Sequence, residues 1–169
     1  MITAKVGNLL KSITLENLDS IINAANGIGP MGAGIAGAIR KYGGKEIQND
    51  AFRVCNELDP MEGDAYSTIS GKLKNIGVKR IIHAVTMKQP GGDTSLDICK
   101  NAFNNALKLA KSLEIKKIGC TALGTGIGGL DPIEVAKVMV NVAKQYNDID
   151  IIFIDFNDSF INTILQEIK

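Results

Sequence analysis

The sequence is poor in the residues that build metal and redox centres. Its 169 residues include no tryptophan, one histidine and three cysteines, and Cys55, Cys99 and Cys120 form no Cys-x-x-Cys pair. With only His83 beside them, they are too few for the usual four ligands of a structural zinc site. An odd number of such thiols is typical of buried, reduced cysteines in a cytoplasmic protein. We therefore predict no metal site, no bound cofactor and a cytoplasmic location.

Excess charge and long apolar runs are also missing. Nineteen basic and eighteen acidic residues leave a net charge of +1, so the overall balance predicts no bulk binding to nucleic acid. No apolar run approaches the roughly 18 residues of a membrane-spanning helix, and the opening MITAKVGNLL does not read as a signal peptide. We expect a soluble protein that makes no membrane contact and holds any ligand in a local site.

The chain shows no tandem repeat, low-complexity tract or linker, and we predict a single domain over residues 1–169. Apolar and alternating runs predict six strands, at 2–6, 20–25, 63–69, 79–86, 116–121 and 150–156. Apolar stripes of helical period predict five helices, at 34–42, 45–58, 94–113, 132–146 and 158–168, with 8–18 irregular. This alternation predicts an α/β fold, a three-layer α/β/α domain with a six-stranded mixed sheet whose first strand is antiparallel. His83, inside an apolar strand, is expected to be a core residue.

Five glycines lie between Gly27 and Gly37, directly after the predicted strand at 20–25; we call this segment the first glycine loop. Glycine lets a backbone approach a ligand closely, and a strand-to-helix junction of this kind turns N–H groups toward an anion. Asn23 and Asn26 add amides that suit a ribose hydroxyl pair beside a phosphate. The alternative is a tight turn whose asparagines bond only loop backbone.

A second such segment, Ala122 to Asp131, follows the strand at 116–121; we call it the second glycine loop. Two glycine-rich loops after strands of one sheet can face each other across its carboxyl edge and form a ligand cleft. Asp131, followed by Pro132 and Glu134, also fits the start of a helix, so capping is the alternative to a catalytic role.

The run Asn23-Ala24-Ala25-Asn26, followed by Gly32 to Ile39, resembles the signature of the macro domain family, and the match extends over nearly the whole chain. Members of that family bind ADP-ribose and sometimes hydrolyse its derivatives. The resemblance implies the same α/β/α fold, and it implies ADP-ribose or an ADP-ribosylated small molecule or protein as partner. The oligomeric state stays open.

The resemblance also implies the binding residues. The diphosphate would lie between the backbone amides of the two glycine loops, with Asn26 at the distal ribose. The residues implied are Asn8, Ser12, Ile13, Ala24, Ala25, Asn26, Gly32, Ala33, Gly34, Ile35, Ala36, Gly124, Thr125, Gly126, Ile127, Gly128 and Phe156.

The base end departs from the family. The Gly-Asp whose carboxylate commonly takes the adenine amino group is missing, and Asn8 or Ser12 stands in its place. Either could accept a hydrogen bond, more weakly than a carboxylate. Phe156 falls where an aromatic often stacks on adenine, and core packing is its alternative role.

For catalysis, two branches of the family are relevant. One hydrolase branch has an aspartate where this chain has Ala36. The other, the terminal ADP-ribose glycohydrolases, acts through a lysine and an aspartate. Asp131 matches that aspartate, whereas the lysine's place is taken by Met87, with Lys88 one position along. The catalytic candidates are therefore Asp131 and Lys88.

We expect hydrolysis of an ADP-ribosyl ester, on a protein or on O-acetyl-ADP-ribose. The alternatives are a non-catalytic ADP-ribose-binding module, an ADP-ribose-1''-phosphate phosphatase and an unrelated mononucleotide-binding enzyme.

Overall fold

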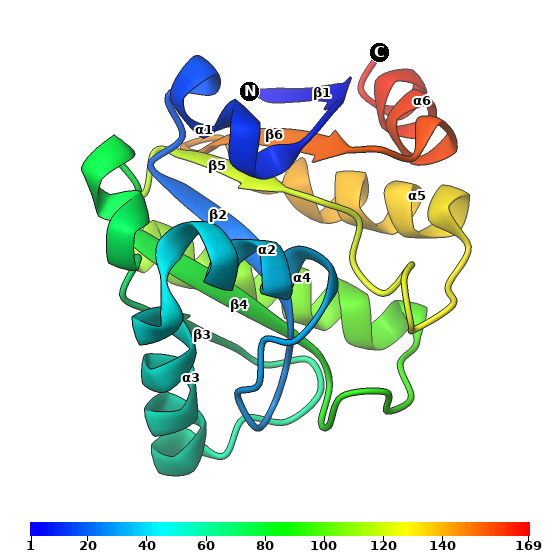
Figure 1. The fold of residues 1–169 in the computed structure, drawn as a ribbon. Coiled ribbons are helices and arrows are strands. Elements are labelled where there is room, and N and C mark those ends of the chain that lie inside the picture. Colours follow the sequence, from blue (N-terminus) through cyan, green and yellow to red (C-terminus); the bar gives the residue numbers. More distant parts are fainter.

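The computed structural model of the chain describes all 169 residues and contains one six-stranded sheet, in the order β1-β6-β5-β2-β4-β3 (Figure 1). The strands are β1 (Ile2–Val6), β2 (Ser20–Asn26), β3 (Ala65–Thr68), β4 (Arg80–Met87), β5 (Lys117–Cys120) and β6 (Asp150–Asp155). The predicted α/β fold with a six-stranded mixed sheet is confirmed.

The expectation that the first strand is antiparallel was wrong. β1 pairs parallel with β6, and β3 is the one antiparallel strand, beside β4. Connection length explains the difference, because parallel neighbours need a helical crossover whereas antiparallel neighbours do not. β3 and β4 are joined by a link that holds only the short 3₁₀ helix η1 (Gly71–Ile76).

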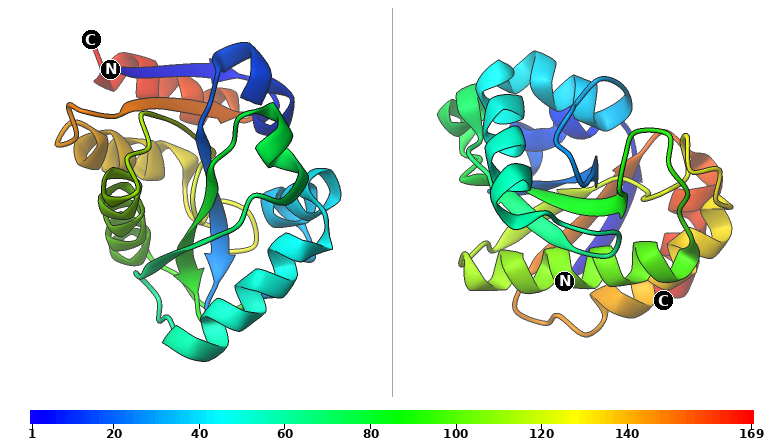
Figure 2. Two further views of the ribbon diagram at one scale, coloured as in Figure 1. Left: turned by 90° about the vertical axis from the view of Figure 1, so that its left-hand side faces the viewer. Right: turned by 90° about the horizontal axis from the view of Figure 1, so that it is seen from below.

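Helices cover both faces of the sheet and complete the three layers (Figures 1 and 2). One face packs against α1 (Leu9–Glu16), α2 (Gly34–Gly43) and α3 (Lys45–Leu58). The other face packs against α4 (Leu96–Ser112), α5 (Pro132–Ala143) and α6 (Asp158–Glu167). No helix of the chain is both long enough and apolar enough to span a membrane.

The segment expected to be irregular, 8–18, contains helix α1. Asn8 caps this helix, since its side-chain oxygen accepts a hydrogen bond from the N–H of Lys11 at 3.1 Å. Leu9, Leu10 and Ile13 are buried under the sheet. A helix of 8 residues is too short to show a clear periodic pattern, so its stability comes from this packing.

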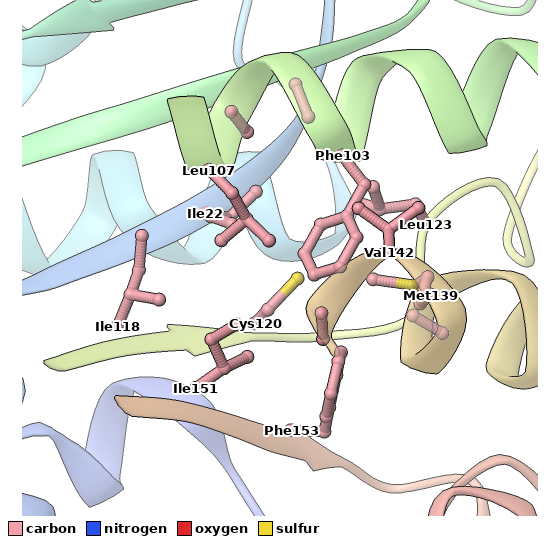
Figure 3. Packing of buried hydrophobic residues seen from close by; sticks show 14 of the residues in the cluster. Ile22, Phe103, Leu107, Ile118, Cys120, Leu123, Met139, Val142, Ile151 and Phe153 are labelled. Carbon is pink, nitrogen blue, oxygen red and sulfur yellow. The ribbon is translucent and has the colours of Figure 1, made fainter. Parts of the chain in front are cut away.

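The larger core lies between the sheet and α4 to α6 (Figure 3). Phe153 of β6 packs against Phe103 of α4 and Phe160 of α6, with ring centroids 5.9 and 6.0 Å away. Cys120 lies in this core, and all three cysteines are buried and free, as predicted. The packing fixes the carboxyl ends of β5 and β6, and parallel pairing brings the end of β2 to the same edge.

Candidate functional site

A cavity of about 610 Å³ opens at the carboxyl edge of the sheet; we call it the cleft. Its size is that of a small-molecule site. It is lined by the ends of β2, β4, β5 and β6, by the start of α1, and by both glycine loops. The lining comprises Gly7, Asn8, Leu9, Leu10, Ala24, Ala25, Asn26, Ala33, Gly34, Ile35, Ala38, Thr86, Met87, Thr121, Ala122, Gly124, Thr125, Gly126, Ile127, Gly128, Asp155 and Phe156.

Asn26 organises the first glycine loop. Its side-chain oxygen accepts hydrogen bonds from the N–H groups of Ile28 and Gly29, at 3.1 and 2.8 Å, and its nitrogen donates to the carbonyl of Pro30 at 2.8 Å. One N–H of the amide remains for a ligand, because the nitrogen carries two. Asn26 therefore shapes the loop from the cleft wall.

Helix α2 begins at the cleft without a side-chain cap. Ala33 occupies the N-cap position and makes no side-chain hydrogen bond. The first N–H groups of a helix have no intrahelical acceptor, and the helix dipole adds partial positive charge there. Gly34 has a φ of 59°, and a Cβ placed on it would meet no atom within 4 Å. This helix start is uncapped and open, and such a start favours an anion.

The second glycine loop closes on itself opposite the first. Gly129 N–H donates to the carbonyl of Gly126, and Leu130 N–H to that of Gly124, both at 3.0 Å. A Cβ on Gly128 would lie 2.6 Å from the Cγ2 of Thr94 and 2.7 Å from the carbonyl oxygen of Gly124, so the position excludes larger residues. The loop therefore lines the cleft mainly with backbone.

One end of the cleft carries its only aromatic side chain. Phe156 lines the cleft and is 73% exposed, so its ring is not a core residue. Asn8 lines the same cavity, and so does Asp155, which sequence reasoning missed. Gly7 N–H donates to the backbone carbonyl of Asp155 at 3.0 Å, which joins the chain just before Asn8 to the end of β6. The sequence signal that could have identified Asp155 is an acidic residue at the end of a predicted strand, directly before Phe156.

Several implied binding residues lie outside the lining. Ile13 is fully buried, and the Ser12 hydroxyl donates to the carbonyl of Asn8 at 2.7 Å within the helix. Gly32 and Ala36 belong to the first glycine loop but do not line the cavity. The other thirteen implied binding residues all line it.

The structure does not bring the two catalytic candidates together in the cleft. Lys88 Nζ donates to the carboxylate of Asp59 at 2.6 Å and to the carbonyl of Pro60 at 2.9 Å, whereas Met87 lines the cleft. The carboxylate of Asp131 accepts a hydrogen bond from the N–H of Ile133 at 2.9 Å and caps α5. Neither residue is part of the lining.

Asn23 and His83 form a buried network behind the cleft. Asn23 Nδ2 donates to His83 Nδ1 at 3.1 Å, and His83 Nε2 donates to the hydroxyl of Thr68 at 2.8 Å. Complete burial lowers the pKa of His83 to about 3, so the ring is neutral at pH 7. It also stacks on Tyr66, with centroids 4.6 Å apart. His83 is a core residue, as predicted.

The electrostatics of the cleft are unusual for an anion site. No lysine, arginine or histidine lines it, and Asp155 is the only charged side chain in the lining. An anion would therefore be held by backbone N–H groups and by the dipole of α2.

The comparisons agree with this geometry. The Macro domain family model matches residues 22–139. An uncharacterised protein of Aquifex aeolicus is 37% identical over 136 residues, which cover 80% of this chain and 78% of that protein. An uncharacterised protein of Thermotoga maritima is 37% identical over 159 residues, 93% of this chain, but the match spans only 24% of its length.

Two solved structures have similar folds. The macrodomain of Mycobacterium tuberculosis DarG has a TM-score of 0.80 and 26% identity, over 92% of this chain and 97% of that one. A mutant macrodomain of Oceanobacillus iheyensis with ADPR also has a TM-score of 0.80, at 24% identity, over 99% of this chain and 90% of that one.

Proposed function

The chain belongs to the macro domain family, and from that premise we propose that it binds ADP-ribose, free or attached to another molecule, in the cleft. The observation that carries the proposal is the pair of glycine loops facing each other across a cavity of about 610 Å³. A diphosphate would accept hydrogen bonds from the free N–H groups at the start of α2 and from the second glycine loop.

The other parts of the ligand find matching groups along the cleft. The spare N–H of Asn26 suits the distal ribose at one end, and the exposed ring of Phe156 suits a base at the other. The Oceanobacillus macrodomain, which has a similar fold, is described with ADPR, and this supports ADP-ribose as the ligand.

Isothermal titration calorimetry with ADP-ribose, AMP and ribose 5-phosphate tests the proposal. We expect micromolar affinity for ADP-ribose, about −7 to −9 kcal/mol, and clearly weaker binding of AMP. AMP reaches only the base end, whereas ADP-ribose spans both glycine loops. Equal affinity for AMP and ADP-ribose would remove the argument from the paired loops.

Hydrolysis of an ADP-ribosyl ester is the second candidate function. The observation in its favour is the position of Asp131, which directly follows Gly129 and Leu130 at the end of the second glycine loop. Gly129 has a φ of 68°, so the chain turns sharply just before this carboxylate. Against it, neither candidate side chain lines the cleft: Asp131 caps α5, and Lys88 is bonded to Asp59. A catalytic role would require both side chains to leave these partners. Binding is therefore the better supported function.

A further inference from the structure

A side chain of helix α3, outside the cleft lining, holds the first glycine loop in place. Gln48 lies near the start of α3, and its Oε1 accepts the N–H of Met31 at 2.9 Å. Met31 is 2% exposed and packs in the core between the sheet and α1 to α3. A buried N–H without an acceptor is destabilising, and Gln48 is the one acceptor of this N–H. The bond therefore fixes how Met31 is seated in the core.

The face of α3 that carries Gln48 lies directly against the loop. Phe52 follows Gln48 by four residues, so the two side chains share one face of the helix. A Cβ on Gly29 would lie 2.9 Å from the Cδ1 of Phe52 and 3.0 Å from its backbone nitrogen. The loop is thus in close contact with α3 at Gly29 and hydrogen-bonded to it at Met31.

The bond from Gln48 is the last restraint before the free N–H groups that face the cleft. The hydrogen bonds of the Asn26 side chain reach only as far as Pro30. After Met31, neither Gly32 nor Ala33 donates its N–H to another backbone group.

Glycine tolerates many backbone conformations, so a short glycine-rich segment is ordered mainly by its two ends. One end of this segment is helix α2, and the other is Met31. The position of Met31 therefore decides where the N–H groups between them point.

We propose that Gln48 is a positioning residue of the diphosphate site. It does not line the cleft, and it acts through Met31 by holding the glycine segment in its binding conformation before the ligand arrives. Without that bond, binding would have to order the segment, and affinity would fall by the free energy of this ordering. The inference rests on the proposed binding of ADP-ribose and adds a residue of α3 as a determinant of affinity.

The first test is calorimetry with ADP-ribose on the wild type, on Gln48→Met and on the control Gln166→Met. Methionine resembles glutamine in length and helix propensity but lacks the amide oxygen. Gln166 is exposed on α6 and lies outside the cleft lining. We expect Gln48→Met to bind about 3- to 10-fold more weakly, the usual net worth of one hydrogen bond, and Gln166→Met to bind like the wild type.

A conservative variant separates the hydrogen bond from general packing. Gln48→Glu keeps an acceptor oxygen at the same place, and raised salt screens its added charge. At about 0.5 M salt, where screening acts within a few ångströms, Gln48→Glu should bind ADP-ribose like the wild type. If Gln48→Met does not fold, Gln48→Ala takes its place in the comparison.

Two further measurements respond to positioning and not to a general loss of structure. Adenosine has no phosphate, so its weak binding, followed by NMR titration, should be the same in the wild type and in Gln48→Met. In the free protein, the amide hydrogen of Met31 should exchange faster in Gln48→Met than in the wild type or in Gln48→Glu.

The inference is overturned if Gln48→Met binds ADP-ribose as tightly as the wild type, or if it loses adenosine binding in the same proportion. It also fails if Gln48→Glu at raised salt binds as weakly as Gln48→Met, or if the exchange of the Met31 amide is unchanged in Gln48→Met. A wild type that binds no ADP-ribose would instead refute the proposed function, and the inference would fall with it.

Discussion

Replacement of Gly34 by glutamate tests the proposed anion site at the start of α2. Gly34 lines the cleft and has a φ of 59°, and a Cβ there would meet open space. Any side chain at this position costs about 1–2 kcal/mol of left-handed strain, which lowers the melting temperature by roughly 2–8 °C in a domain of this size. The variant should therefore fold.

The loss of affinity follows from charge. A carboxylate about 5 Å from one phosphate charge is repelled by about 0.8 kcal/mol in water and by about 3 kcal/mol at an effective dielectric constant of 20. The corresponding loss of ADP-ribose affinity is about 4- to 200-fold. Gly34→Gln is the matched control, because it has nearly the same shape and the same backbone strain without the charge.

Calorimetry with ADP-ribose and thermal unfolding of both variants separate the two effects. We expect equal melting temperatures and weaker binding by Gly34→Glu than by Gly34→Gln, with the gap narrowing as salt screens the repulsion. Equal affinities of the two variants would refute the placement of the diphosphate at α2, even if both bind more weakly than the wild type.

Three further predictions concern the base, the second glycine loop and the core. Phe156→Ala should weaken ADP-ribose binding by about 1–2 kcal/mol in calorimetry with an unchanged melting temperature, since the ring is 73% exposed; unchanged affinity would exclude stacking. If the wild type hydrolyses O-acetyl-ADP-ribose or a glutamate-linked ADP-ribosyl peptide, Asp131→Asn should slow turnover by about 10²- to 10⁴-fold. The asparagine should still cap α5. Undiminished turnover would reject the catalytic role of Asp131. The pKa of His83 is about 3 in the folded chain and about 6.5 in the unfolded chain. Between about pH 6.5 and about pH 3, His83 therefore binds a proton in the unfolded chain but not in the folded chain. The free energy of unfolding should therefore fall by about 2 kcal/mol from pH 7 to pH 5, as urea titration would measure, and His83→Gln should remove most of that fall.

The parts of the fold that the sequence predicts are those with local causes. Strands β2 and β5 are short apolar runs ended by glycine-rich segments, and these signals lie within a few residues of the structure they produce. Helix α1 was missed, and β1 instead of β3 was predicted as the antiparallel strand, because these features depend on packing and on connection length. No local pattern encodes either.

The residues of the candidate site also divide into those that a local sequence pattern predicts and those that depend on distant contacts. Gly34 and Gly126 line the cleft, and glycine spacing singled them out because it marks places where a ligand can approach the backbone closely. The direction of Lys88 depends on Asp59, 29 residues away in the chain, and sequence position alone does not reveal that ion pair. Asp155 was not predicted as a cleft residue because it is the last residue of an apolar strand. The alternation of side chains along a strand indicates which face of the sheet a residue lies on, but not that it lines a cleft at the end of the strand.

The absence of cations in the cleft lining determines which molecules compete for it in a cell. A site built from lysines and arginines ranks ligands by total charge, so a nucleoside triphosphate would displace a diphosphate ester. In this cleft each extra phosphate would lose hydration and gain no counter-charge. Fixed N–H groups instead rank ligands by where their oxygens lie, so we expect triphosphates and RNA to compete poorly with ADP-ribose for this cleft.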